Sequence, residues 1–306
     1  MIIIKLINHL LSVLNLVIVF RIGKALGDQL CITGYLRKKK YQNKRFIVIT
    51  NNRDFFLHNP EVILNIGIKS TNSFILKILR KARSANIIYF NFYNNDSTLE
   101  DFMRETSYKL HLIDLHSNNY IKGTQNFGYR NEIFFSKIEC QIYKDKFKDI
   151  SDFAIIHPYT KKSYTPNKQW EIEKFQEVVD KLPTVKWIQL GRSNETLLKN
   201  VIDFREKLSM REIFFLIKHA KFLLSCEGFF NHVSSAFYTP SFVVLSGFHD
   251  KSIAHYANTI FIENQDVCHD SPCWLTTECK YQGRPCLGSI KSDDVVRKIN
   301  EVNLHN

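Results

Sequence analysis

The chain has 306 residues, of which 44% are hydrophobic and 24% are charged. This is an ordinary globular composition, sufficient for one large domain or two domains of about 150 residues each. The formal net charge is +12, and residues 1–150 carry almost all of it, with 23 Lys and Arg against 12 Asp and Glu. We expect that half to meet nucleic acid, an acidic membrane surface or a phosphorylated glycan or lipid, unless its basic residues only form a solvated face.

The N-terminal stretch, residues 1–20, is apolar but is interrupted by Lys5, Asn8 and Asn15. A spanning helix needs about 20 mostly apolar residues, and a signal peptide needs a basic start and a small-residue cleavage site, so neither is predicted. We expect residues 2–14 to form an amphipathic helix on a membrane or on the protein itself. With no secretory signal, the seven cysteines indicate a reducing cytoplasm, and the protein could be peripheral on the inner membrane.

Apolar runs typical of buried strands alternate with helical patterns along the chain. Strands are predicted at 16–20, 46–50, 62–66, 86–90 and 110–115, and then at 153–157, 185–190, 222–225, 242–245 and 259–262. The clearest helices are 170–182, with apolar residues at helical spacing, and 209–219, which opens with a capping box. Alternation of this kind predicts an α/β protein with parallel sheets. The restart near residue 150 predicts two Rossmann-like domains, 1–150 and 151–306, facing a central cleft.

The most informative segment is 222–247, which reads strand, polar corner, short helix and strand. Ligands bind beyond the carboxyl ends of parallel strands, and Glu227, Gly228 and His232 fall at such an end. A helix that starts at Phe229 would point free backbone N–H groups at a bound phosphate.

Three further polar corners follow predicted strands. Asp28 comes after the first strand and could act as a general base or simply cap a helix. Thr160 and Lys168 follow the strand at 153–157 and are residue types that can bind phosphate oxygens. The same residues would also be found in a solvated lysine loop without a ligand. The loop from Gly191 to Glu195 could hold a nucleoside or be an ordinary surface loop.

Together these corners resemble the bacterial family 9 glycosyltransferases, the heptosyltransferase family. The Gly-Asp loop at 27–28, the Lys-x-Trp at 168–170, the Gly-to-Glu loop at 191–195 and the segment 209–232 occur in the family's order. The resemblance covers most of the chain and is strongest from 153 to 290. It implies a GT-B fold, with the acceptor on the first domain and the nucleotide-sugar donor on the second.

The resemblance also implies roles for single residues. Asp28 matches the family's general base, Lys168 its donor-phosphate lysine, and Glu195 a nucleoside-contacting carboxylate. The motif around the diphosphate and sugar matches Glu227, Gly228, Phe229 and His232. This chain departs from the family pattern in having Glu227 for the usual Asp and Phe229 where Gly is common. Its loop from Gly23 to Asp28 also looks one residue longer than the family's.

Four cysteines lie within 19 residues, at Cys268, Cys273, Cys279 and Cys286. Thiolates at this density could bind Zn²⁺ or iron, but the spacing is looser than paired Cys-x2-Cys, so reduced thiols or a disulfide are open alternatives. Similar loops occur in family 9 enzymes, and an iron-binding version is known among the autotransporter heptosyltransferases. Any such metal is expected to be structural, with no cofactor needed for catalysis.

The sequence thus predicts an inverting glycosyltransferase, with ADP-heptose as the first candidate donor and a lipopolysaccharide core or other anionic glycan as acceptor. The acceptor is expected to meet the basic run Arg37, Lys38, Lys39 and Lys40, and a second cluster at 77–83. One alternative is a nucleotide-sugar epimerase of similar fold, which needs no acceptor, and another is an autotransporter protein heptosyltransferase. A nucleic-acid-binding protein is disfavoured, because the chain has no evident RNA- or DNA-binding motif.

Overall fold

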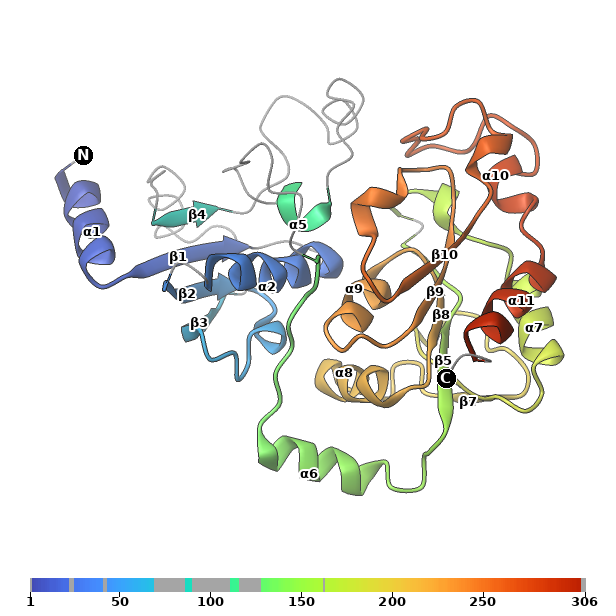
Figure 1. The fold of residues 1–306 in the computed structure, drawn as a ribbon, viewed down its shortest axis with the longest axis horizontal. Helices are drawn as coiled ribbons and strands as arrows, with labels where there is room; N and C mark the ends of the chain where they lie inside the picture. Colours follow the sequence, from blue (N-terminus) through green and yellow to red (C-terminus); the bar gives the residue numbers. More distant parts are fainter. Residues whose placement is uncertain are drawn as a thin grey trace. The chain divides into compact units, whose positions relative to one another are not determined.

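The computed structural model describes residues 2–21, 25–40, 43–68, 86–89, 111–115, 128–161 and 163–303. Contacts divide the chain into two compact units, Met1–Glu139 and Cys140–Asn306, whereas the sequence prediction drew the division at 150–151. Each unit contains one parallel sheet with helices packed on it (Figure 1). The predicted α/β class is therefore confirmed.

The first unit has a four-stranded parallel sheet in the order β3-β2-β1-β4. The register sets Ile18 of β1 between Ile47 of β2 and Ile87 of β4. β-branched residues favour such buried, pleated surfaces, and four of the five strands predicted in this half are present. The described elements are α1 (Ile2–Val13), β1 (Leu16–Arg21), α2 (Leu26–Lys40), β2 (Arg45–Thr50), η1 (Arg53–Phe55), β3 (Val62–Gly67), β4 (Ile87–Tyr89) and α5 (Leu112–Leu115).

The strand predicted at 110–115 is wrong, because Leu112–Leu115 form the short helix α5. His111 Nδ1 accepts a hydrogen bond from the Ile113 N–H at 3.1 Å, which starts a helical turn. Ile113 is fully buried and approaches α2 so closely that a Cβ on Gly34 would meet its Cδ1. A short apolar run fits a buried helix as well as a strand, so periodicity could not separate the two.

Helix α1 packs on the first sheet through Ile7 and Leu11. Leu11 is buried and Ile7 is partly buried against Phe20, Ile49 and Ile87. A second apolar set on the same helix and just beyond it is more than half exposed, namely Leu6, Leu10, Val13 and Leu14. The predicted amphipathic helix is therefore present and is apolar on two sides. Among the residues described, no helix is both long and apolar enough to cross a membrane.

The second unit has a six-stranded parallel sheet in the order β10-β9-β8-β5-β6-β7. Its strands are β5 (Phe153–His157), β6 (Lys186–Gln189), β7 (Val201–Asp203), β8 (Leu223–Cys226), β9 (Ser241–Leu245) and β10 (Thr259–Glu263). All five strands predicted in this half are present. The edge strand β7 was not predicted, since three residues that are only partly buried leave little pattern.

Helices cover both faces of the second sheet (Figure 1). α7 and α11 lie on one face and bury Phe175, Val178, Val295 and Ile299 in the main core, whereas α8 and α9 lie on the other. The predicted capping box opens α8, where Ser209 accepts from the Glu212 N–H and Glu212 accepts from the Ser209 N–H. The helices are α6 (Lys137–Lys146), α7 (Ile172–Lys181), α8 (Met210–His219), α9 (Phe229–Ser235), α10 (Pro285–Gly288) and α11 (Ser292–Asn303), with short 3-10 turns at η2 (Pro166–Lys168), η3 (Lys251–Ala254) and η4 (Gln265–Val267).

Candidate functional site

The segment after β8 forms the centre of the site. The strand register sets Ser225 opposite His157 of β5 and Cys226 opposite Val244 of β9. Glu227 and Gly228 follow directly, before α9 begins at Phe229. They lie at the carboxyl edge of the sheet, which is where open parallel sheets bind ligands.

Glu227 is the hub of a buried charged cluster. Its Oε2 lies 2.6 Å from Lys168 Nζ and 3.1 Å from His249 Nε2, and its Oε1 lies 3.9 Å from His232 Nε2. The Glu227 side chain is 7% exposed and the Lys168 side chain 17%, so both charges are largely removed from water. Such burial is costly unless the charges pair, and clusters of this kind concentrate at functional sites.

The two histidines are held by aromatic neighbours. His232 Nδ1 shares a 2.6 Å hydrogen bond with the Tyr256 hydroxyl. The His249 ring lies 5.8 Å from the Phe248 ring and 5.9 Å from the Trp274 ring. Lys168 Nζ lies 4.9 Å above the Phe248 ring, so the ammonium also has a cation–π partner.

The pKa values of Glu227 and His232 are shifted so that the two groups differ in charge at neutral pH. Burial by itself raises the pKa of the Glu227 carboxyl, but Lys168 and His249 outweigh it and hold that pKa well below its usual value. Burial lowers the pKa of His232 to about 4, against the opposing effect of the Glu227 carboxylate. At neutral pH the site therefore contains an ionised Glu227 and a neutral His232 ring.

Lys168 ends a tight turn that we call the Lys168 turn, residues 165–169. The Thr165 hydroxyl caps it by accepting from the Asn167 N–H at 3.1 Å. Gln169 Oε1 accepts from the Thr160 N–H at 2.9 Å, and Gln169 Nε2 donates to the Pro158 carbonyl. The half-buried Thr160 is thereby tied to the turn that carries Lys168.

The loop from Gly191 to Glu195 folds onto itself. Gly191 has φ +145°, and a Cβ there would collide with the Glu195 carboxylate, so this position requires glycine. Glu195 Oε2 accepts from the Arg192 N–H at 2.9 Å. Burial raises the pKa of Glu195, partly opposed by that backbone bond and by the charge of Arg192. The Tyr159 hydroxyl accepts from the Thr196 N–H and joins this loop to the one after β5.

In the first unit, Asp28 lies in the first turn of α2, directly after β1, and is half-buried. Arg37 is also on α2, where its Nη1 donates to the Gly128 carbonyl and its Nε lies 3.7 Å from Glu132. This guanidinium is therefore engaged within its own unit. Lys38, Lys39 and Lys40 continue the same helix, and the cluster at 77–83 lies outside the described residues.

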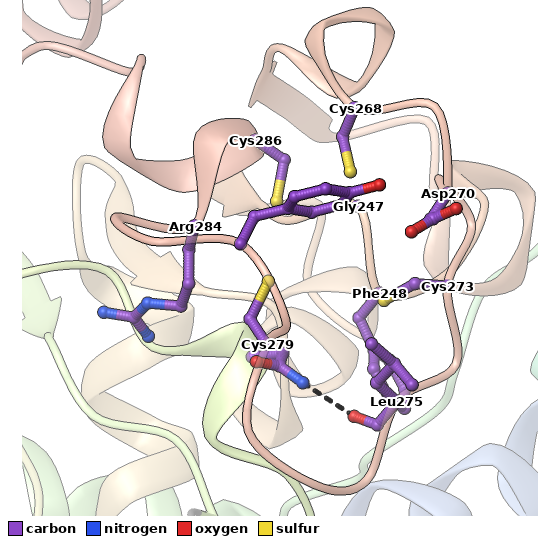
Figure 2. A pocket seen from close by; sticks show the side chains of 11 residues that line it. Gly247, Phe248, Cys268, Asp270, Cys273, Leu275, Cys279, Arg284 and Cys286 are labelled. Atoms are coloured by element: carbon purple, nitrogen blue, oxygen red, sulfur yellow. Dashed lines mark hydrogen bonds between the residues drawn. The ribbon is translucent and has the colours of Figure 1, made fainter.

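The four clustered cysteines belong to one loop, residues 268–286, which we call the cysteine loop. Their side chains line a single cavity (Figure 2), and none of them forms a disulfide. Burial raises the pKa of Cys273 and Cys286, and the neighbouring cysteines raise it further. Within the described part of the chain, no three His, Cys, Asp or Glu side chains stand together as metal ligands.

Sequence reasoning missed two members of the cluster, His249 and Tyr256. His249 follows β9 within four residues, so the rule that identified the other strand-end corners could have found it. Tyr256 carries no such signal, because it lies in a connection between strands and reaches His232 from 24 positions along the chain.

No family model matches the chain, and no curated protein matches it in sequence. Solved structures match nearly its whole length. A glycosyl transferase family 9 protein from Veillonella parvula has a TM-score of 0.67 at 15% identity, with 95% of this chain and 97% of that one covered. The E. coli ADP-heptose LPS heptosyltransferase II has a TM-score of 0.64 at 13% identity, with 94% and 99% covered.

A third similar structure is TibC from enterotoxigenic E. coli, described as an iron-containing dodecameric glycosyltransferase. Its TM-score is 0.67 at 15% identity, and 95% of this chain and 76% of that one are covered. Identities this low establish the fold and leave roles of single residues to their geometry. The resemblance read from the sequence is confirmed at the level of fold, and this chain has the architecture of the family 9 glycosyltransferases of known structure.

Proposed function

We propose that the protein is an inverting glycosyltransferase that moves a sugar, heptose first among candidates, from a nucleotide-sugar to an anionic surface-glycan acceptor. The observation that carries the proposal is the Lys168–Glu227–His232–His249 cluster at the carboxyl edge of the second sheet. A cation beside a carboxylate and a neutral imidazole suits a donor with a diphosphate next to a sugar. The shared fold supports the same reading.

The second unit would bind the donor. Lys168 Nζ meets the diphosphate oxygens, exchanging part of its contact with Glu227 for contact with phosphate. Glu227 and His232 then face the sugar hydroxyls, and Phe229 and Gly228 line the approach to α9. The nucleoside and phosphates would contact residues that follow the neighbouring strands β5 and β6, namely Thr160 after β5 and Gly191 and Glu195 after β6.

The reaction needs one proton transfer and one displacement. Asp28 takes the proton of an acceptor hydroxyl, whose oxygen forms a bond to the anomeric carbon from the face opposite the diphosphate. The bond from that carbon to the diphosphate oxygen breaks, and the leaving group departs with the electron pair. Lys168 stabilises the negative charge that grows on it, the electrostatic contribution that is usually largest.

The direct test is mass spectrometry of products after incubation with nucleotide-sugars, ADP-heptose first, and a truncated lipopolysaccharide core. A mass gain of one sugar on the acceptor, with release of the nucleoside diphosphate, is the expected result. Conversion of the donor to an isomer without any acceptor would instead identify an epimerase and overturn the proposal.

The general base has its own test. Asp28→Asn removes the base and keeps the shape, so we expect transfer to fall by at least 100-fold while calorimetry finds donor affinity nearly unchanged. Asp54→Asn, a matched change elsewhere in the first unit, should retain turnover. Near-normal turnover in Asp28→Asn would remove Asp28 from the mechanism.

We further propose that the cysteine loop holds a structural Zn²⁺ or iron ion through Cys268, Cys273, Cys279 and Cys286. The four thiols line one cavity and are of a donor type that suits either metal, but among the described residues they do not yet stand together as ligands, so an ion would have to draw them together. One protein of the same fold is described as iron-containing. Elemental analysis of protein purified without chelator should find about one equivalent, lost in Cys273→Ser and Cys286→Ser. A metal-free protein of full stability would mean four reduced thiols.

We also propose that α1 rests on an anionic membrane surface. Its outward set, Leu6, Leu10, Val13 and Leu14, is exposed. Exposed Lys5 lies on the same helix, and exposed Arg45 pairs in register with Leu16, shortly after the helix ends. Leu6→Ser with Leu10→Ser should abolish co-sedimentation with phosphatidylglycerol vesicles, while Ile138→Ser with Ile142→Ser, exposed on α6, should not. Equal loss in both pairs would contradict a specific role for α1.

A further inference from the structure

The cysteine loop is joined to the Lys168 turn by side chains on the turn. Thr165 Oγ1 donates to the Leu275 carbonyl at 2.8 Å. Asn167 Nδ2 donates to the Leu275 and Thr277 carbonyls, both at 2.8 Å. Thr165 and Asn167 are 1% and 5% exposed, so these bonds are sheltered from water and hold the turn against the loop.

The loop also reaches back to the turn. Arg284 Nη1 donates to the Pro166 carbonyl at 3.0 Å and to the Gln169 carbonyl at 2.9 Å. These carbonyls belong to residues on either side of Lys168. A three-residue 3-10 turn has little stability of its own, so the backbone position of Lys168 depends on its partners in the cysteine loop.

A second set of contacts joins the loop to the other side of Glu227. The Cys273 N–H donates to the Gly247 carbonyl and the Trp274 N–H to the Phe248 carbonyl, both at 2.9 Å. The buried Trp274 ring packs 5.4 Å from Phe248, the ring beneath the Lys168 ammonium. A Cβ on Gly247 would meet Ser271 Oγ at 2.9 Å, so strand end and loop are in close contact.

We propose that the cysteine loop is a positioning element of the donor site, and that Asn167 and Arg284 are positioning residues for Lys168. The loop sets Lys168 on one side of Glu227 and His249 on the other, which fixes the distance between the cation and the rest of the cluster. The proposal rests on the proposed function insofar as Lys168 meets a diphosphate. A flexible lysine binds a phosphate well only when its backbone is fixed, since ordering it during binding lowers affinity.

Asn167 and Arg284 also line the cavity that the four thiols line (Figure 2). In Figure 2 the sulfur atoms of Cys279 and Cys286 are turned toward the cavity, and the Arg284 guanidinium points away from them. On this proposal, a rearrangement of the cysteine loop would shift Lys168 through the hydrogen bonds of Asn167 and Arg284. The loop would then affect donor affinity as well as stability.

The test is a double-mutant cycle read by calorimetry with ADP as the probe. Arg284→Met keeps the aliphatic stem and removes two hydrogen bonds, and we expect it to raise the Kd for ADP by about tenfold. In a Lys168→Ala background the same change should alter Kd by less than about twofold. Arg297→Met, an exposed arginine on α11, is the matched control and should leave Kd unchanged. An equal loss in both backgrounds would overturn the proposal.

A second measurement does not depend on the donor. Amides in the Lys168 turn and directly after it are hydrogen-bonded, including Gln169 to Pro166 and Trp170 to the Cys226 sulfur. Hydrogen exchange of the peptide covering 163–170 should be faster in Arg284→Met and Asn167→Leu than in Arg297→Met. Unchanged exchange would overturn the positioning role by itself. Faster exchange in a protein that does not bind ADP would uphold that role and count against the proposed function.

Discussion

The Lys168–Glu227 pair is the residue-scale feature that most shapes the chemistry of the site. Two buried charges contribute little net stability when they pair, but removing one partner leaves the other uncompensated. Here the carboxylate has Lys168 and His249 on the same oxygen, at 2.6 and 3.1 Å. If the proposed function is correct, an incoming diphosphate would share Lys168 while His249 continues to contact Glu227.

Under the proposed function, Lys168→Ala should weaken both donor affinity and turnover, because the lysine would meet negative charge in the ground state and in the transition state. We expect at least a tenfold rise in the donor Kd by calorimetry and a larger fall in kcat/KM. Lys181→Ala, which removes an exposed lysine paired with Asp293, is the control. An unchanged donor Kd in Lys168→Ala would mean that the phosphates bind elsewhere.

His232 should make stability depend on pH. Its folded pKa of about 4 lies below its ordinary value of 6.5, so between these values the unfolded chain binds a proton that the folded chain does not. Stability is then lost as pH falls from 6.5 towards 4, by roughly 3 kcal/mol at 1.4 kcal/mol per pKa unit. Glu227, whose folded pKa is depressed, adds a loss in the same direction below about 4.5.

Urea unfolding at pH 7.5, 5.5 and 4.5 measures this effect. His232→Gln should flatten the decline between pH 6.5 and 4, because Gln takes up no proton. His255→Gln, at an exposed position, should follow the unmodified protein. If His232→Gln declines as steeply as the unmodified protein, other groups cause the acid sensitivity.

Among the helices and strands, α8 is one whose first residue could be predicted from a local sequence motif, the capping box. Its capping box satisfies N–H groups at the helix start, and the middle of the helix is buried at Phe214, Leu216 and Ile217. Glu212 of the box also pairs with Lys146 of α6. The start of α8 could be read from four consecutive residues because a cap is a local interaction.

Ser209→Ala should lower the free energy of unfolding by about 1 kcal/mol, the usual cost of losing an N-cap. Chemical denaturation monitored by circular dichroism measures it. Ser151→Ala, at an exposed position outside any helix, should change stability by less than about 0.5 kcal/mol. Equal effects at the two serines would mean that the cap contributes nothing of its own.

Other elements were harder to predict from local signals. Within the run predicted as a strand, residues 112–115 form helix α5, in which Ile113 packs against α2, a contact that an apolar sequence does not specify. β7 pairs with β6 through only three residues and was missed. Both errors concern short elements, for which tertiary packing outweighs propensity.

At the scale of the whole molecule, the uneven distribution of charge is the main sequence feature for which no binding partner has been identified. Residues 1–150 hold 23 basic residues against 12 acidic ones. Arg37 is paired with Glu132, and we propose that Lys38, Lys39 and Lys40, which follow it on α2, meet the anionic acceptor. Exposed charges are screened beyond about 8–10 Å at physiological salt, so such binding should weaken steeply with ionic strength.

Changing Lys38, Lys39 and Lys40 to Glu should raise the acceptor KM by at least tenfold at low salt and leave the donor KM unchanged. The control changes Lys144, Lys148 and Lys186 of the second unit, all exposed, to Glu and alters net charge equally. Steady-state kinetics at several salt concentrations separate the two. Normal use of the acceptor by the first triple variant would show that the basic run is not its binding site.

By itself, the sequence determined the α/β class, nine of the ten strands it predicted and the strand-end corners that hold Lys168, Glu227 and His232. Those features depend on periodicity, caps and turn residues within a few positions of one another. Only the tertiary structure brought Lys168 to Glu227 across 59 positions and Arg284 to Pro166 across 118. Such contacts depend on which strands neighbour one another and on how a distant loop packs over their ends, and no local pattern encodes either.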